Sequence, residues 1–96
     1  MKHCIIVKFT DAVTDKPALT ERIAELFSSW TQYPFLTGCE LIPNCVDRAN
    51  RYDLMIVLTL EQSGLPLWDG CELHGEWKRV FGQFVAAKAI FDCNGR

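Results

Sequence analysis

Residues 52–61 read Tyr-Asp-Leu-Met-Ile-Val-Leu-Thr-Leu-Glu, an apolar run that is typical of a β-strand covered on both faces. Residues 3–9 have the same character and predict another such strand. Alternation along residues 3–9 places four side chains together on one face, namely His3, Ile5, Val7 and Phe9. The opposite face is also largely apolar, so both strands are expected to lie in the middle of a covered sheet.

An amphipathic helix is predicted between these two strands. Thr14 or Asp15 suits its N-cap, and Pro17 suits its first turn, where a missing N–H costs little. Apolar side chains recur along one stripe of this helix, at Leu19, Ile23, Leu26, Phe27 and Trp30. Pro34 is expected to end it.

The remaining elements follow from turn residues and periodicity. Thr37–Ile42 predicts a short strand, and the polar residues 44–51 predict a loop before the strand of residues 52–61. Glycines between residues 64 and 75 allow only broken helical turns, so the second helix is expected after Gly75. Its apolar stripe comprises Trp77, Val80, Phe81, Phe84 and Val85. Lys88–Cys93 predicts a fourth strand, and residues 94–96 predict a frayed tail.

The order strand–helix–strand–strand–helix–strand predicts an α+β fold in one domain, residues 1–96. It fits the ferredoxin-like β-α-β-β-α-β arrangement, a four-stranded antiparallel sheet with the helices on one face. Helices on one face leave the other face of the apolar strands bare. We therefore expect a homodimer in which two open sheet faces pack together.

Composition excludes several classes of protein. Ten basic and twelve acidic residues give a formal charge of −2, which argues against nucleic acid as a partner. No run of about 18 apolar residues is present, so no membrane span is expected, and the early lysines argue against a signal peptide. Five cysteines without a CxxC pair favour reduced thiols over disulfides or a metal site. We expect a cytoplasmic protein without a metal or cofactor.

Residues 2–9, 52–61 and 90–92 together resemble the stress-responsive A/B-barrel family, also called Dabb. Residues 2–9 read Lys-His-Cys-Ile-Ile-Val-Lys-Phe, where the family tends to have Lys-His, four apolar residues and Lys-Phe. The family's His-Pro-x-His motif is similar to residues 71–74 here, Cys-Glu-Leu-His, followed by Trp77. The resemblance spans almost the whole chain and implies two copies assembled into a dimeric α/β barrel.

The resemblance also implies candidate catalytic residues. In a polyketide cyclase of the family, which needs no cofactor, the second histidine of that motif is the base, and it matches His74. His3 matches a first-strand histidine at the pocket. Trp68 stands near the place of the cyclase's assisting tyrosine, and Leu54 replaces a further pocket histidine. These two departures separate the chain from the cyclase pattern.

Imidazole accepts protons near neutral pH, which abstraction next to a carbonyl group requires, so His74 and His3 are the candidate catalytic residues. The alternatives are that His74 hydrogen bonds the broken helix and that His3 bonds neighbouring backbone. The candidate ligand-binding residues are apolar and lie between helices and sheet: Ile5, Val7, Leu54, Ile56, Trp68, Trp77 and Phe81. Trp68 is interpreted either as a lid over a pocket or as a plug of the core.

Lys88, Ile90 and Asp92 alternate on one face of the last predicted strand. A lysine in an apolar strand either binds a carboxylate or extends its ammonium group to the edge, and the second interpretation is favoured.

Three functions remain open from the sequence. The first is a protein that binds a small hydrophobic metabolite and acts as a cofactor-free cyclase or lyase with a histidine base. The second is a non-catalytic stress-response or ligand-binding protein. The third, a haem-degrading monooxygenase-like enzyme, is implied only by related dimeric α/β barrels, and the first strand lacks the asparagine that those enzymes use.

Overall fold

A computed structural model describes residues 1–94, and Gly95 and Arg96 of the predicted tail lie outside the described residues. Four strands form one sheet: β1 (Lys2–Phe9), β2 (Leu36–Pro43), β3 (Leu54–Leu60) and β4 (Val85–Cys93). Three α-helices accompany them: α1 (Lys16–Phe27), α2 (Leu65–Gly70) and α3 (Glu72–Phe81). Short 3₁₀ turns at Ser28–Gln32, Gln62–Gly64 and Gly82–Phe84 connect these elements.

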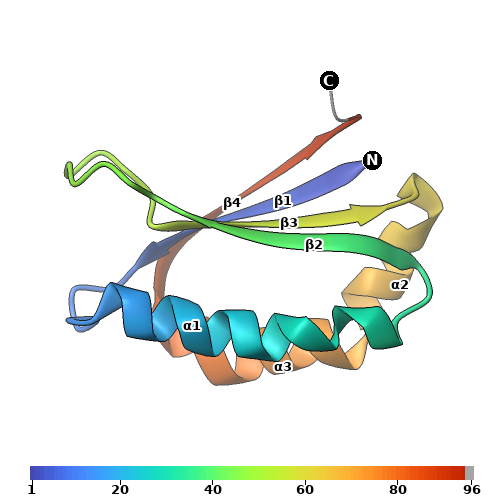
Figure 1. Ribbon diagram of the computed structural model, residues 1–96, viewed down its shortest axis with the longest axis horizontal. Helices are drawn as coiled ribbons and strands as arrows, with labels where there is room; N and C mark the ends of the chain where they lie inside the picture. The colour runs from blue at the N-terminus through green and yellow to red at the C-terminus, as the bar shows by residue number, and fades with distance from the viewer. Residues whose placement is uncertain (95–96) are drawn as a thin grey trace.

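The strands lie in the order β2-β3-β1-β4, and every neighbouring pair is antiparallel. The two strands with apolar side chains on both faces, β1 and β3, are thus the central strands, as their composition predicted. The helices all lie against one face of the sheet, and no helix within residues 1–94 covers the other face (Figure 1). The predicted α+β, ferredoxin-like fold is confirmed.

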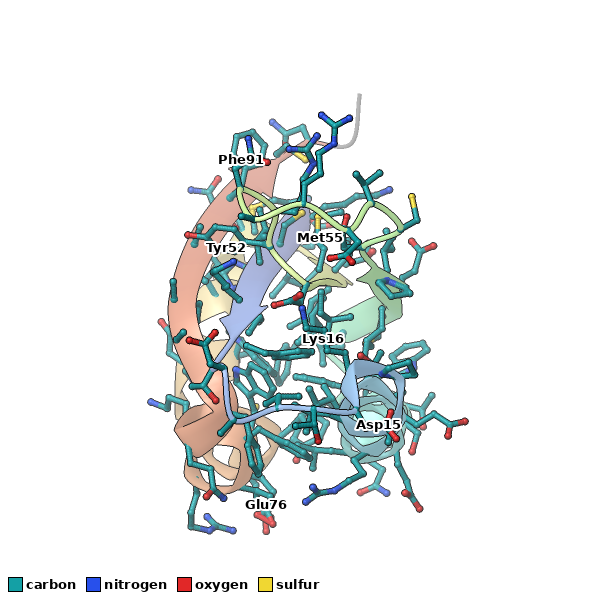
Figure 2. The ribbon with its side chains drawn as sticks, turned by 90° about the vertical axis from the view of Figure 1, so that its left-hand side faces the viewer. Asp15, Lys16, Tyr52, Met55, Glu76 and Phe91 are labelled. Atoms are coloured by element: carbon teal, nitrogen blue, oxygen red, sulfur yellow. The ribbon has the colours of Figure 1, made fainter. Side chains whose placement is uncertain are left out.

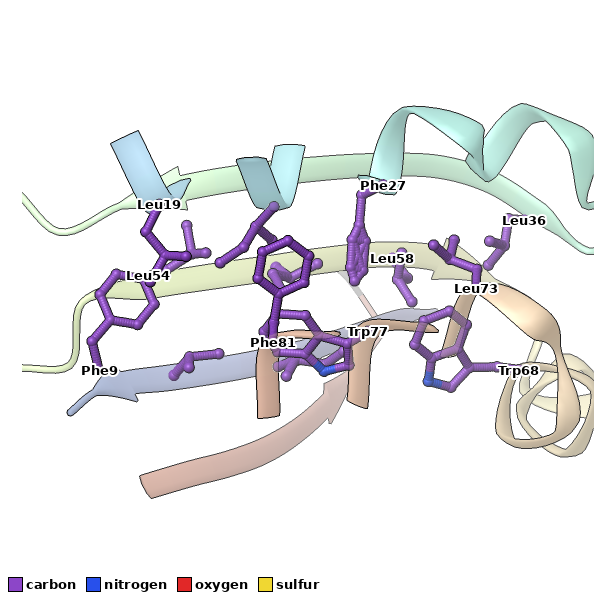
Figure 3. Close-up of a cluster of buried hydrophobic side chains, with 14 of the residues drawn as sticks. Phe9, Leu19, Phe27, Leu36, Leu54, Leu58, Trp68, Leu73, Trp77 and Phe81 are labelled. Atoms are coloured by element: carbon purple, nitrogen blue, oxygen red, sulfur yellow. The ribbon is translucent and has the colours of Figure 1, made fainter. Parts of the chain in front are cut away.

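The core lies between this sheet and the helices, where side chains of both layers meet (Figure 3). The ring of Phe27, from α1, packs against two indoles, those of Trp68 in α2 and Trp77 in α3. Its centroid lies 5.6 Å from that of Trp77 and 6.2 Å from that of Trp68. Trp68 is only 1% exposed. Aromatic and aliphatic side chains together fill the space between helices and sheet.

The first helix begins as predicted and ends earlier. Asp15 is the N-cap, and its carboxylate accepts a hydrogen bond from the backbone N–H of Ala18 at 3.0 Å. Pro17 lies in the first turn. The helix ends at Phe27, so the prediction that Trp30 continues its stripe is wrong. Trp30 lies in the 3₁₀ turn that follows and is half-buried against the core.

The expectation of a helix only after Gly75 is wrong. Helix α3 begins at Glu72 and contains Gly75 in its interior. Leu73, Trp77 and Phe81 recur at intervals of four residues, and each is at most 4% exposed. A glycine inside a helix costs about 1 kcal/mol, whereas burial of one large apolar side chain contributes about 1.5–3 kcal/mol. Burial of this stripe therefore outweighs the cost of the glycine.

Strand boundaries differ from the predicted ones by one to three residues. β3 begins at Leu54 instead of Tyr52. The residue before it, Asp53, accepts hydrogen bonds from Phe9 and Lys16. β4 begins at Val85 instead of Lys88, because Val85 still pairs with Phe9 beyond an irregularity in the register. Pro43 ends β2 and is tolerated there because β2 is an edge strand.

The helix-free face of the sheet carries a row of apolar side chains. Ile6 of β1 pairs with Met55 of β3, and Cys4 pairs with Phe91 of β4. Phe91 is 60% exposed. In Figure 2, Phe91 and Met55 lie toward the top, on the opposite side of the molecule from α3. Among residues 1–94 there is no helix of sufficient length and hydropathy to cross a membrane.

Candidate functional site

A pocket of about 240 Å³ is lined by strands β1 and β4 and by helices α2 and α3. Most of the residues of β4 are exposed, because the helices pack mainly on the central strands. The pocket is lined by apolar walls and several polar groups: His3, Ile5, Trp68, Asp69, His74, Trp77, Lys88 and Ile90. Its volume suits a small molecule only, since typical ligand pockets measure about 300–1,000 Å³.

Strand register explains why β4 supplies three side chains to this side of the sheet. Lys88 lies opposite Val7, Ile90 opposite Ile5, and Asp92 opposite His3. Val7, Ile5 and His3 face the helices and are buried. Because directly paired residues share a face of the sheet, Lys88, Ile90 and Asp92 face the helices as well.

His3 and Asp92 form a hydrogen-bonded pair. Nδ1 of His3 lies 2.5 Å from Oδ1 of Asp92. The His3 side chain is 9% exposed, whereas the Asp92 side chain is 40% exposed. A carboxylate only accepts hydrogen bonds, so Nδ1 of His3 carries the proton and donates it. Nε2 then keeps the lone pair and is the basic atom of the imidazole.

His74 is tied to the preceding helix. Its Nδ1 lies 3.0 Å from the backbone carbonyl oxygen of Asp69. Because a carbonyl only accepts, Nδ1 donates here too, and Nε2 is again the basic atom. The ring also lies 4.7 Å from the Trp68 indole, centroid to centroid. These contacts join the first turn of α3 to α2 and hold the imidazole in the lining of the pocket.

The structure brings together five of the residues that the sequence proposed for the site. His3, Ile5, Trp68, His74 and Trp77 all line the pocket. The other four candidates are core residues and do not line it, namely Val7, Leu54, Ile56 and Phe81. They lie in the hydrophobic core between the sheet and the helices.

Asp92, Lys88, Ile90 and Asp69 were absent from the proposed site. The alternation of Lys88, Ile90 and Asp92 along one face of β4 was visible in the sequence. What the sequence lacked was the register that sets this face against His3. Asp69 gave no such signal, because it occupies the end of a six-residue helix that was predicted only as broken turns.

A second depression, of about 640 Å³, lies between the start of α1 and the loop that joins β2 to β3. Its main charged groups, Lys16 and Asp53, neutralise one another at 2.8 Å. Asp53 also accepts a hydrogen bond from the backbone N–H of Phe9 at 2.8 Å. Burial opposes the charged form, but the hydrogen bonds from Lys16 and Phe9 outweigh it and hold the pKa of Asp53 below its ordinary value.

Comparisons with known proteins identify the fold. No family profile matches the sequence. No curated protein sequence matches it either.

Solved structures match closely over nearly the whole chain. A dimeric protein of unknown function and ferredoxin-like fold from Bacteroides fragilis is similar with a TM-score of 0.80 and 12% identity, over 96% of this chain and 92% of that one. A Dabb family protein with a ferredoxin-like fold from Mesorhizobium loti is similar with a TM-score of 0.72 and 12% identity, over 99% of this chain and 95% of that one. A hydroxynitrile lyase from Passiflora edulis is similar with a TM-score of 0.74 and 11% identity, over 99% of this chain and 94% of that one. The chain thus has the ferredoxin-like fold that a Dabb family protein also has, as the sequence resemblance implied.

Proposed function

We propose that residues 1–96 form a Dabb-type domain that binds a small, largely apolar carbonyl compound and removes a proton from it without a cofactor. The observation that carries this proposal is the His3–Asp92 pair, which meets a pocket walled by Ile5, Trp68 and Trp77. An imidazole in contact with a carboxylate beside an apolar pocket is an arrangement suited to general-base catalysis.

The proposed step is ordinary enolate chemistry. Nε2 of His3 takes a proton from a carbon bonded to a carbonyl group, and the C–H electron pair forms the double bond of the enolate. The enolate carbon then attacks a second carbonyl carbon, and the resulting alkoxide takes the proton back from the His3 imidazolium. Asp92 is a positioning residue, because it fixes the tautomer of His3 and stabilises the imidazolium between the two steps.

We assign the base to His3 rather than to His74, which the family resemblance favoured. A carboxylate stabilises an imidazolium, whereas the backbone carbonyl that contacts His74 carries only a partial charge. The hydroxynitrile lyase among the similar structures supports a catalytic role for a protein of this fold. At 11% identity, it supports no particular substrate.

The proposal can be tested without knowledge of the natural substrate. We suggest 5-nitrobenzisoxazole, a small planar probe whose ring C–H is removed by a base while its N–O bond breaks, giving a coloured phenolate. His3→Ala should lower kcat/KM by about 10²-fold, the lower range for general-base catalysis. Asp92→Asn should lower it, and Asp92→Glu should restore part of the loss. His74→Ala should have a smaller effect than His3→Ala.

The controls separate chemistry from folding. Asp92 stays partly exposed when His3 is removed, so its carboxylate keeps water contacts and His3→Ala should fold normally by circular dichroism. Free imidazole at the same concentration gives the background rate. A wild-type rate equal to that background, or a folded His3→Ala variant of unchanged rate, would refute the catalytic role.

The second candidate function is ligand binding without chemistry. The contacts of His74 with Asp69 and Trp68 favour it, because they give a structural role to the imidazole that the family resemblance implied as the base. If the probe binds the protein but does not react, this alternative replaces the first. The haem-degrading alternative gains no support, since a haem macrocycle is far larger than a pocket of about 240 Å³.

We propose further that the protein is a homodimer that packs the two helix-free sheet faces together into an α/β barrel. The exposed Phe91, with Ile6 and Met55 beside it, supports this interface, as does the dimeric neighbour from Bacteroides fragilis. Native mass spectrometry should give the mass of a dimer, and Phe91→Lys should shift it to a monomer. Leu67→Lys is the matched control, because Leu67 is nearly as exposed as Phe91 but belongs to α2.

We also propose a cytoplasmic location. The five cysteines, all within the described part of the chain, form no disulfide, which is the usual state in a reducing compartment.

A further inference from the structure

The strand wall of the pocket has the His3–Asp92 pair at one end and Lys88 at the other. His3 lies opposite Asp92, and Lys88 lies four residues earlier along β4 on the same face. A strand rises about 3.3 Å per residue, so the Cα atoms of residues 88 and 92 are about 13 Å apart. Ile90 and its partner Ile5 lie between them and form an apolar floor.

Lys88 makes no ion pair within residues 1–94, whereas several other basic side chains contact protein groups. Lys16 pairs with Asp53, Arg79 pairs with Glu76, and the guanidinium of Arg22 lies over two phenylalanine rings. Within residues 1–94, no carboxylate lies within ion-pair distance of the Lys88 ammonium. The side chain nevertheless lines the pocket that contains the two histidines.

The Lys88 end of the pocket favours an anion. Lys88 is the lysine of the lining, and Asp69 is the acidic residue that the lining contains. The Asp92 carboxylate is hydrogen bonded to His3 at the other end of the strand wall. The rest of the lining is largely apolar and comes from Ile5, Ile90, Trp68 and Trp77.

We infer that Lys88 makes the pocket selective for a small carboxylate, whose anionic end contacts the ammonium group while its reacting carbon lies toward His3. This inference rests on the proposed function, since it assigns the substrate class of the same pocket. The carboxylate is remote from the acidic C–H, so it binds and orients the molecule and does not take part in the proton transfer. A charge-assisted hydrogen bond at an apolar site is about twice as strong as a neutral one, which makes it effective for selection.

The test compares benzoate with benzamide, which has nearly the same shape and no charge. Binding is followed by NMR through the indole N–H signals. The signals of Trp68 and Trp77 are expected to shift, whereas the signal of Trp30 should keep its chemical shift. Benzoate should bind at least about tenfold more tightly than benzamide to the wild-type protein. Lys88→Gln should abolish this preference, and Lys88→Arg should retain it. Lys78→Gln is the matched control, because Lys78 is an exposed lysine of α3 outside this pocket.

The outcomes separate this inference from the proposed function. Equal binding of both probes to the wild-type protein overturns the anion selectivity and leaves the apolar pocket intact. A preference for benzoate that survives in Lys88→Gln assigns the anion to another group and also overturns the inference. If neither probe shifts the Trp68 and Trp77 signals, the pocket itself is refuted, and the proposed function fails with it.

Discussion

Replacement of Gly75 by alanine tests the start of helix α3, the element that presents His74 and Trp77. Gly75 is the fourth residue of the helix, and its N–H donates to the carbonyl oxygen of Cys71 at 3.2 Å. A methyl group built at this position meets no atom within 4 Å, and the backbone has no positive φ. The substitution therefore introduces neither a clash nor a new packing contact.

The expected gain comes from the backbone alone. Glycine inside a helix is less favourable than alanine by about 0.5–1 kcal/mol, because it loses more conformational freedom on folding. Gly75→Ala should raise the free energy of unfolding by that amount. For a domain of this size, about 1 kcal/mol corresponds to a rise in Tm of about 4–8 °C.

Urea unfolding followed by far-ultraviolet circular dichroism gives the measurement. The midpoint should rise without a change in m-value. Both proteins must be compared at one concentration, because association stabilises the folded state. Gly38→Ala is the opposite control, since its methyl group would lie 3.1 Å from the Thr59 hydroxyl and should destabilise β2. An unchanged or lower midpoint for Gly75→Ala would refute a helix that begins at Glu72.

Two further predictions concern titratable groups. The pKa of Asp53 is lower in the folded protein than in the unfolded chain, so its contribution to stability is present above the ordinary carboxyl value and is lost as the pH falls through the folded value. In Asp53→Asn, the urea midpoint should therefore fall less steeply as the pH is lowered into the acid range. A fall as steep as that of the wild-type protein would contradict this reasoning. Burial raises the pKa of the Cys39 thiol to about 11, so iodoacetamide at pH about 8 should alkylate the exposed Cys45 well before Cys39. Peptide mass spectrometry would show the order, and equal rates would argue that Cys39 is accessible.

The sequence predicted the fold because the decisive signals are local. An apolar run with side chains on both faces, as in residues 54–60, has to be a central strand, and the observed strand order agrees. Proline and capping residues located the start of α1 correctly. The start of α3 was missed because a helix-breaking signal, Gly75, was weighed locally, whereas the burial of Trp77 and Phe81 that overrides it depends on the whole core.

The candidate site was only partly predictable. The family resemblance pointed to His3 and His74, and both line one pocket. It could not separate the pocket from the core, because that division depends on how Phe27 and Trp77 fill the space above the central strands.

The tertiary structure alone decided the partner of the proposed base. His3 and Asp92 are 89 residues apart in the chain, and neither segment by itself indicates that they pair. They meet because β1 and β4 pair in one register, and a shift of one residue would turn Asp92 to the opposite face. Side-chain periodicity is a local property that the sequence carries, whereas the register between distant strands is set by the packing of the whole sheet.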